Sequence, residues 1–199
     1  CQNLTHFWCT AYIYFIMPVV LVSVSSGDQP FPLGLAYLAS NLRTEYGDTV
    51  EILDVHALGL STRQACDRIL ATKPSVVGLS YITYQAEQCY ELSVLLKQAN
   101  RDITIVHGGI HASVLPFEAC ANGADCVVIG EGEETFQELL DRLRIGEGLD
   151  GVAGLCFKKP GSQEVTTNLP RPLINDLDKL TPPRWDAFNL NLYLESYLK

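Results

Sequence analysis

His107-Gly-Gly-Ile-His-Ala-Ser113 directly follows the apolar run 103–106, and Gly130-Glu-Gly-Glu-Glu-Thr-Phe136 directly follows the apolar run 126–129. In both places an apolar run gives way to glycine and then to a helical pattern. In an open parallel α/β sheet, ligands bind at such strand ends. Glycine there has no Cβ atom, so a large, flat ligand can approach the backbone closely. These two segments therefore predict a cofactor site at the carboxyl edge of a parallel sheet.

The rest of the chain alternates between buried-strand and helical patterns. Strands are expected at 18–24, 49–54, 75–80, 103–107 and 125–129. Two helices are expected to start near residues 32 and 61, and a short one to span 114–121. Two more have their apolar faces at 89–96 and 136–143. Proline at position 32 favours a first helical turn, and the segment 61–64 has the pattern of a capping box. Five β-α units predict a flavodoxin-like, doubly wound α/β sheet of order 2-1-3-4-5, with its ligand crevice between strands one and three.

Composition restricts the class of protein. The chain has 199 residues, of which 47% are apolar and 19% are charged, and it carries a net charge of -9 with 14 Lys and Arg residues. This length and composition indicate one globular domain with an extension. The sequence has no basic stripe or arm, which argues against nucleic acid as a partner.

The cysteines indicate reduced thiols. The sequence contains seven, none of them in a C-x-x-C pair: Cys1, Cys9, Cys66, Cys89, Cys120, Cys126 and Cys156. An odd number scattered through apolar segments is typical of buried thiols in a cytoplasmic protein. We therefore expect this chain alone to hold neither zinc nor an iron–sulfur cluster.

The apolar N-terminal run 7–24 has two interpretations. Its length approaches the roughly 20 residues of a membrane-spanning helix. Alternatively the run divides at Met17-Pro18, and 18–24 forms a buried parallel strand. We favour the strand, because a helix would remove the first strand of the α/β pattern. Residues 1–16 are then expected to be a disordered or foreign leader, and no membrane partner is expected.

The character of the sequence changes after Gly148. The segments 152–157 and 164–167 predict two short strands around the turn Lys158-Lys-Pro-Gly161. From Asn168 onward, prolines and spaced apolar residues predict an extended connector. We therefore divide the chain into the leader, a domain at 17–148, and a β extension with a linker at 149–199 that leads into a longer protein.

Four blocks together resemble one enzyme family. The blocks are Pro32-Leu-Gly-Leu-Ala-Tyr-Leu-Ala39, Gly108-Gly-Ile-His-Ala-Ser-Val-Leu-Pro116, Gly130-Glu-Gly-Glu133 and Arg171-Pro-Leu-Ile-Asn-Asp-Leu-Asp-Lys-Leu180. In this order and spacing they are similar to the N-terminal part of cobalamin-dependent radical S-adenosylmethionine (SAM) enzymes. The resemblance covers residues 17–199.

That resemblance implies a division of labour. The N-terminal domain of the family holds cobalamin, and a following barrel cleaves S-adenosylmethionine at a 4Fe-4S cluster to methylate an unreactive carbon or to form a ring. The barrel would follow the linker in the same chain, so no catalytic residue is expected in these 199 residues, and this part alone should be inactive.

The expected cofactor-binding residues lie on three strand ends and the first helix. They are Leu33, Gly34, Ser80, Tyr81, Thr83, Gly108, Gly109, Ile110, His111, Gly130, Glu131 and Gly132. The hydroxyls of Ser80 and Thr83 would bind the cofactor's tail or cap a helix, and the Tyr81 ring would pack against the corrin. His111 would contact a corrin amide or fix its own loop. The backbone amides of Gly130 and Gly132, at the start of the helix with its apolar face at 136–143, would donate hydrogen bonds to the cofactor.

Asp54-Val-His-Ala-Leu-Gly59 fits the D-x-H-x-x-G pattern by which methionine-synthase-like corrinoid proteins supply a histidine to cobalt. In that group the motif follows the first strand, whereas here it follows the second, which is the edge strand of the expected order. We therefore expect no protein ligand to the metal, with Leu33 presenting an apolar surface to it. The alternative role of His56 is that of a solvated loop residue.

Two other classes of protein remain open. A stand-alone corrinoid carrier would bind cobalamin without a barrel, and the D-x-H-x-x-G pattern favours it. A phospho-receiver or an interaction module could have the same fold. A receiver needs Asp after strand three and Lys after strand five, but Ser80 and Gly130 stand there.

Overall fold

A single seven-stranded sheet organises the molecule. The structure is a computed structural model that describes residues 17–24, 31–46 and 50–197. The strands are β1 (Val19–Ser23), β2 (Val50–Asp54), β3 (Val76–Ser80), β4 (Thr104–Gly108), β5 (Cys126–Val128), β6 (Leu155–Lys158) and β7 (Val165–Thr167). Their order is β2-β1-β3-β4-β5-β6-β7, in which β1 to β5 are parallel and β6 and β7 are antiparallel. The predicted α/β class and the order 2-1-3-4-5 are confirmed.

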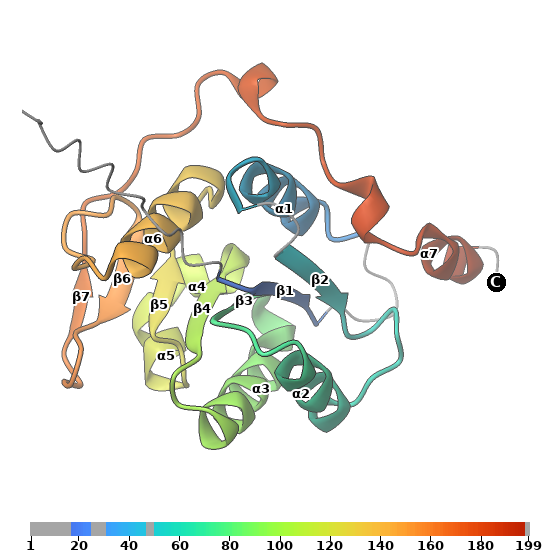
Figure 1. Cartoon of the computed structure of the whole chain (residues 1–199), viewed down its shortest axis with the longest axis horizontal. Helices are drawn as coiled ribbons and strands as arrows, with labels where there is room; N and C mark the ends of the chain where they lie inside the picture. The colour runs from blue at the N-terminus through green and yellow to red at the C-terminus, as the bar shows by residue number, and fades with distance from the viewer. Residues whose placement is uncertain (1–16, 25–30, 47–49, 198–199) are drawn as a thin grey trace, which may run out of the picture.

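Helices cover both faces of the sheet. They are α1 (Leu33–Tyr46), α2 (Thr62–Ala71), α3 (Ala86–Ala99), α4 (Gly109–Val114), α5 (Pro116–Ala121), α6 (Glu133–Ile145) and α7 (Leu190–Tyr197). Figure 1 shows α1 and α6 on one face, and α2, α3 and α5 on the other. The predicted capping box is present at the start of α2, where Ser61 and Gln64 exchange side-chain and backbone hydrogen bonds.

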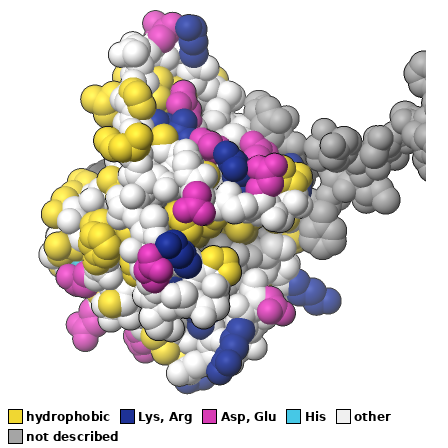
Figure 2. Space-filling view, turned by 90° about the vertical axis from the view of Figure 1, so that its left-hand side faces the viewer, with side chains coloured by type: hydrophobic (Ala, Val, Ile, Leu, Met, Phe, Trp, Pro, Cys, Tyr) yellow, Lys and Arg dark blue, Asp and Glu magenta, His cyan; other side chains and the backbone are white. Residues whose placement is uncertain are grey.

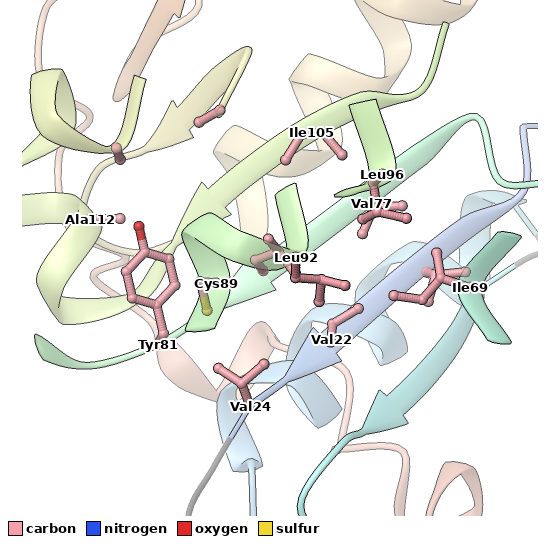
Figure 3. Close-up of a cluster of buried hydrophobic side chains, with 14 of the residues drawn as sticks. Val22, Val24, Ile69, Val77, Tyr81, Cys89, Leu92, Leu96, Ile105 and Ala112 are labelled. Carbon is pink, nitrogen blue, oxygen red and sulfur yellow. The ribbon is translucent and has the colours of Figure 1, made fainter. Parts of the chain in front are cut away.

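Each face of the sheet has its own apolar core, as the alternation of side chains along a strand requires. In β1, Val20 and Val22 belong to the core under α2 and α3, whereas Leu21 belongs to the core under α1 and α6. Figure 3 shows the first core, where Leu92 and Leu96 lie over the strands. The near-continuous apolar runs in the sequence follow from this two-sided burial.

The structure differs from the expectation in two places. The helix expected from residue 114 begins at Gly109, and Leu115 separates it into α4 and α5, with Pro116 in the first turn of α5. Because proline lacks an amide hydrogen, it starts a new helix more readily than it continues an old one. The connector is also not uniformly extended, because short 3-10 turns at Leu177–Lys179 and Trp185–Ala187 precede α7.

The segment 168–197, which we call the strap, runs from β7 past α6 and α1 toward β2 (Figure 1). It joins the two ends of the sheet across one helical layer. At the other end of the sequence, the strand expected at 18–24 is present as β1. The leader expected at 1–16 lies outside the described residues. In the described part of the chain, none of the helices has the length and apolar character needed to cross a membrane.

Candidate cofactor site

A cavity of about 230 Å³ lies between α1, α6 and the sheet, at the carboxyl ends of the parallel strands. Seven of the predicted residues line it: Gly34, Ser80, Gly108, Gly109, Gly130, Glu131 and Gly132. Further lining residues, which the sequence analysis did not single out as site residues, are Leu21, Leu35, Leu38, Gly78, Leu79, Val106, His107, Val128, Glu133 and Phe136. The first helix and three strand ends therefore meet around one mostly apolar hollow, where the sheet order places a ligand.

Gly78, in the middle of β3, keeps this hollow open. A Cβ atom at this position would lie 3.0 Å from Cδ2 of Leu21 and 3.5 Å from Cζ of Phe136. A larger residue would therefore fill the space between the strand and α6. The sequence did carry a signal for this site, because a lone glycine inside an apolar strand often marks a close approach to the backbone.

Gly34 lines the same cavity from the first turn of α1, and a Cβ atom there would meet nothing within 4 Å. The empty direction at Gly34 is therefore available for a ligand. Its neighbour Leu33 is 44% exposed and is not among the residues that line the cavity. The role predicted for Leu33, as an apolar surface toward a metal, stays a prediction.

Gly109 fixes how β4 leads into α4. Its φ is +86°, and a Cβ atom would lie 2.7 Å from the carbonyl oxygen and 2.8 Å from the amide nitrogen of Tyr81. No other residue type fits this combination of left-handed backbone and close contact without a shift. The second glycine of the predicted segment thus packs the α4 turn directly onto the end of β3.

Tyr81 lies in the core and not at the cavity, which corrects the prediction that its ring packs against the corrin. The ring is 2% exposed, and Figure 3 shows it among the buried side chains on the α3 side of the sheet. Its hydroxyl is 2.8 Å from Nδ1 of His107. The residue after β3 points away from the cavity because side chains alternate along the strand.

His107 is fully buried and bonded through both ring nitrogens. Ser93 donates its only hydroxyl proton to the carbonyl of Cys89, so the ring Nε2, 2.8 Å from Ser93 Oγ, must be the donor in that contact. Nδ1 then accepts from the Tyr81 hydroxyl. Burial, with a smaller contribution from the charge of Lys158, lowers the pKa of His107 to about 3. The imidazole is therefore neutral and serves as structural support beneath the glycine segment.

His111 is buried in a second set of hydrogen bonds. The Tyr90 hydroxyl donates to Glu118, so Nε2 of His111, 3.1 Å away, donates to the tyrosine oxygen, and Nδ1 is 3.2 Å from Oγ1 of Thr83. These contacts match the loop-fixing alternative for His111 and use the Thr83 hydroxyl as well. Ile110, which directly precedes His111, is 70% exposed and lies outside the lining of the cavity.

The segment after β5 is tied to its neighbours at two atoms. The amide of Gly130 donates to Ser113 Oγ at 3.0 Å, and the carboxylate of Glu131 accepts from the amide of Ile174 in the strap at 2.7 Å. The Gly130 amide, predicted as a donor to the ligand, is therefore engaged within the protein. What this segment contributes to the cavity is an unobstructed backbone, with a Gly130 φ of +81°.

The D-x-H-x-x-G segment lies on the edge strand β2. Asp54 accepts hydrogen bonds from the amides of His56 and Ala57 at 3.1 Å and 2.9 Å, so its carboxylate caps its own turn. The His56 side chain is exposed, and no residue of β2 or of this turn lines the cavity.

The five cysteines of the described chain are all buried and free. Burial raises the pKa of Cys89 and of Cys126, which keeps these thiols protonated. Across the residues that the structure describes, no group of three or more His, Cys, Asp or Glu side chains is arranged to hold a metal ion.

Charged side chains do not form a field of one sign near the strap. Figure 2 shows acidic and basic side chains lying next to one another on this side of the molecule. Arg171, for example, pairs with Glu134 and Glu138 of α6, and Lys159 pairs with Glu164. Hydrophobic side chains gather along the left margin of the same view.

Comparison with known proteins gives one family and several larger relatives. Residues 19–140 match the family described as the B12 binding domain. Methyltransferase PH0819 of Pyrococcus horikoshii, itself uncharacterized, is 36% identical over 165 residues, which cover 81% of this chain and 35% of the relative. The anaerobic magnesium-protoporphyrin IX monomethyl ester cyclase of Rubrivivax gelatinosus is 32% identical over 177 residues, which cover 85% of this chain and 31% of the relative.

A solved structure shows the same fold. The cobalamin-dependent S-adenosylmethionine radical enzyme OxsB, with aqua-cobalamin and S-adenosylmethionine bound, matches with a TM-score of 0.76 at 24% identity, over 90% of this chain and 25% of that chain. The chain spans about a third of the length of the two curated relatives. These matches confirm the resemblance to cobalamin-dependent radical SAM enzymes that the sequence blocks indicate, and the chain belongs to the B12-binding domain family.

Proposed function

We propose that this chain is the cobalamin-binding part of a radical SAM enzyme that methylates an unreactive carbon or forms a ring. The observation that carries the proposal is the glycine-bordered apolar cavity at the carboxyl ends of β3, β4 and β5. The catalytic barrel, with its 4Fe-4S cluster and S-adenosylmethionine, would lie in the same polypeptide beyond the strap. The relatives support this arrangement because the chain covers only about a third of their length.

The cavity suits one part of cobalamin. Its volume of about 230 Å³ is below the roughly 300–1,000 Å³ of typical ligand pockets, so the corrin macrocycle is too large for it. The planar benzimidazole group of the cofactor's tail matches the apolar space between Gly34, Gly78 and Phe136. The macrocycle would then lie outside, over the backbone at Gly108 and Gly130. Ser80 is the lining residue whose hydroxyl would bind the polar portion of the tail.

The protein's contribution would be binding and orientation. When bound, cobalamin supplies a cobalt centre whose redox and group-transfer chemistry protein side chains lack. The residues of this chain would enclose the tail, hold the macrocycle at the strand ends, and turn its outer face toward the following domain. The buried bonds of His107 and His111 would keep the loops beneath the macrocycle in one conformation.

The 199-residue chain is expected to bind hydroxocobalamin by itself. The purified chain, mixed with hydroxocobalamin and desalted, should retain the visible absorbance of the corrin in stoichiometric amount. Circular dichroism on the same sample shows whether the chain is folded. A folded sample that retains no corrin would contradict the proposal.

We expect His56→Ala to leave the bound cofactor unchanged, because the His56 side chain is exposed on the turn after the edge strand, away from the residues that line the cavity. Electron paramagnetic resonance of the cob(II)alamin form reports a nitrogen ligand as superhyperfine splitting. The spectra of the wild type and the variant should coincide. A splitting that disappears in His56→Ala would show that this histidine binds cobalt and would favour a corrinoid carrier of the D-x-H-x-x-G type.

A further inference from the structure

The strap is bonded to the domain at several separate points. Near its start, the guanidinium of Arg171 donates to Oγ1 of Thr135 at 2.8 Å and forms ion pairs on α6. Further along, Ser40 donates to the carbonyl of Pro182, and the amide of Arg184 donates to the carbonyl of Ala36 at 3.1 Å. The strap therefore follows α6 and then α1, the two helices that enclose the cavity.

An aromatic cluster forms where the strap passes the start of α1. Phe31 stands two residues before α1, and its ring centroid lies 5.0 Å from that of Trp185, 4.2 Å from that of Phe188 and 5.3 Å from that of Tyr193. Aromatic pairs at such distances stabilise a contact beyond the area that they bury. Three aromatic rings of the strap thus contact Phe31, just before α1 begins.

The same tyrosine also contacts the end of β2, the strand that pairs with β1. The Tyr193 hydroxyl donates to Oδ2 of Asp54 at 2.7 Å. Asp54 pairs in register with Ser23, the last residue of β1, and the amide of Val55 donates to the carbonyl of Ser23 at 2.9 Å. Tyr193 therefore joins two elements: its hydroxyl bonds Asp54 at the end of β2, which pairs with the end of β1, and its ring contacts Phe31 before α1.

We propose that Tyr193 is a positioning residue that ties the start of α1 to the end of β2 and so sets the affinity of the domain for cobalamin. Its ring contacts Phe31, three residues before Gly34, and Gly34 lines the cavity. The inference rests on the proposed function. It also gives the D-x-H-x-x-G segment a role other than metal binding, since the Asp54 carboxylate anchors the strap.

Coupling of this kind is reciprocal. If docking of the strap raises the affinity for cobalamin by some factor, bound cobalamin must raise the stability of the docked strap by the same factor. The strap leads toward the C-terminus of the chain. The position of whatever follows it would therefore be linked thermodynamically to occupancy of the cofactor site.

The test compares substitutions at two positions of α7 in the 199-residue chain. Tyr193→Phe removes the hydroxyl and keeps the ring, Tyr193→Leu removes both contacts, and Asn191→Ala alters an exposed residue of the same helix as a control. Titration with hydroxocobalamin, followed by absorbance, should show Kd increased by about fivefold in Tyr193→Phe and by more in Tyr193→Leu. Asn191→Ala should match the wild type.

A cycle with Asp54→Ala assigns the effect to the proposed contact. Once Asp54 is replaced, Tyr193→Phe should have little further effect on Kd, because the two substitutions remove the same hydrogen bond. Hydrogen exchange of peptides from the strap gives the reciprocal measurement. Exchange in the segment 182–193 should slow when cobalamin binds the wild type, and should slow less in Tyr193→Phe.

The outcomes separate the two ideas. A wild type that binds no cobalamin overturns the proposed function and this inference with it. If the wild type binds, an unchanged Kd in both Tyr193 variants overturns the inference alone. Faster exchange in the strap with an unchanged Kd would show that Tyr193 only holds the strap in place, and would also overturn it.

Discussion

Gly34→Phe is expected to abolish retention of cobalamin while leaving the domain folded. Gly34 lines the cavity, and the position of its missing Cβ faces open space, so a phenyl group would occupy the volume proposed for the benzimidazole. Gly34 stands in the first turn of α1, where an added Cβ atom meets nothing within 4 Å, so the substitution should cause no clash within the described domain. Loss of binding would therefore occur without loss of stability, an outcome that separates a blocked site from a damaged fold.

Gly34→Ala is the matched control for that experiment. One methyl group takes little of the cavity, so we expect weaker effects on Kd and a similar or higher temperature of unfolding. Absorbance after desalting measures binding, and circular dichroism on heating measures stability. Full retention of cobalamin by Gly34→Phe would show that the cofactor's tail lies elsewhere.

The pH dependence of stability should reveal the buried His107. Its pKa in the folded protein is about 3, below the ordinary value of 6.5, so between these values the unfolded chain binds a proton that the folded chain does not. The contribution of His107 to the free energy of unfolding is fully present above pH 6.5 and is lost as the pH falls toward 3. Between pH 7.5 and 5.0 the loss is about 2 kcal/mol, given about 1.4 kcal/mol per pH unit below 6.5.

His107→Gln tests this assignment because glutamine can form hydrogen bonds but does not titrate. We expect the variant to be less stable at pH 7.5, by about 2 kcal/mol, since the bonds to Tyr81 and Ser93 are disturbed. Its stability should also fall less steeply with acid than that of the wild type. Urea unfolding at both pH values gives the two slopes, and His56→Gln, at an exposed position, serves as the control. Equal slopes in the wild type and His107→Gln would refute the buried neutral histidine.

The sequence predicts the sheet well because its strands are buried on both faces. Apolar runs such as 18–24 and 75–80 need burial on both faces, which a central strand between two helical layers provides. The short connections between the strands then fix their order. The start of α4 at Gly109, five residues before the expected start of that helix, was not predicted. It depends on the left-handed backbone at Gly109 and on the contact of that residue with Tyr81, which is distant in sequence.

The site was predicted in part, for a similar reason. Glycines that end strands can be found from the sequence, and Gly108 and Gly130 do line the cavity. The side of the sheet that a given side chain faces depends on strand register, and for this reason Tyr81 was assigned to the cofactor although it lies in the opposite core. The contact between the strap and Phe31 was not predicted, because Phe31 lies more than 150 positions before its aromatic partners in the chain.

The cavity between α1 and α6 also interrupts the second core of the protein. Among the residues that the structure describes, none places a side chain in the space between its apolar walls, which include Leu21 and Phe136. A ligand that enters this space completes the core, and by mass action it stabilises the folded chain by about 2.7 kcal/mol at a free concentration one hundred times its Kd. For a protein of ordinary marginal stability, that difference changes the fraction of unfolded molecules about a hundredfold. The supply of the cofactor would thus govern how long each molecule survives proteolysis in the cell, in addition to whether it is active.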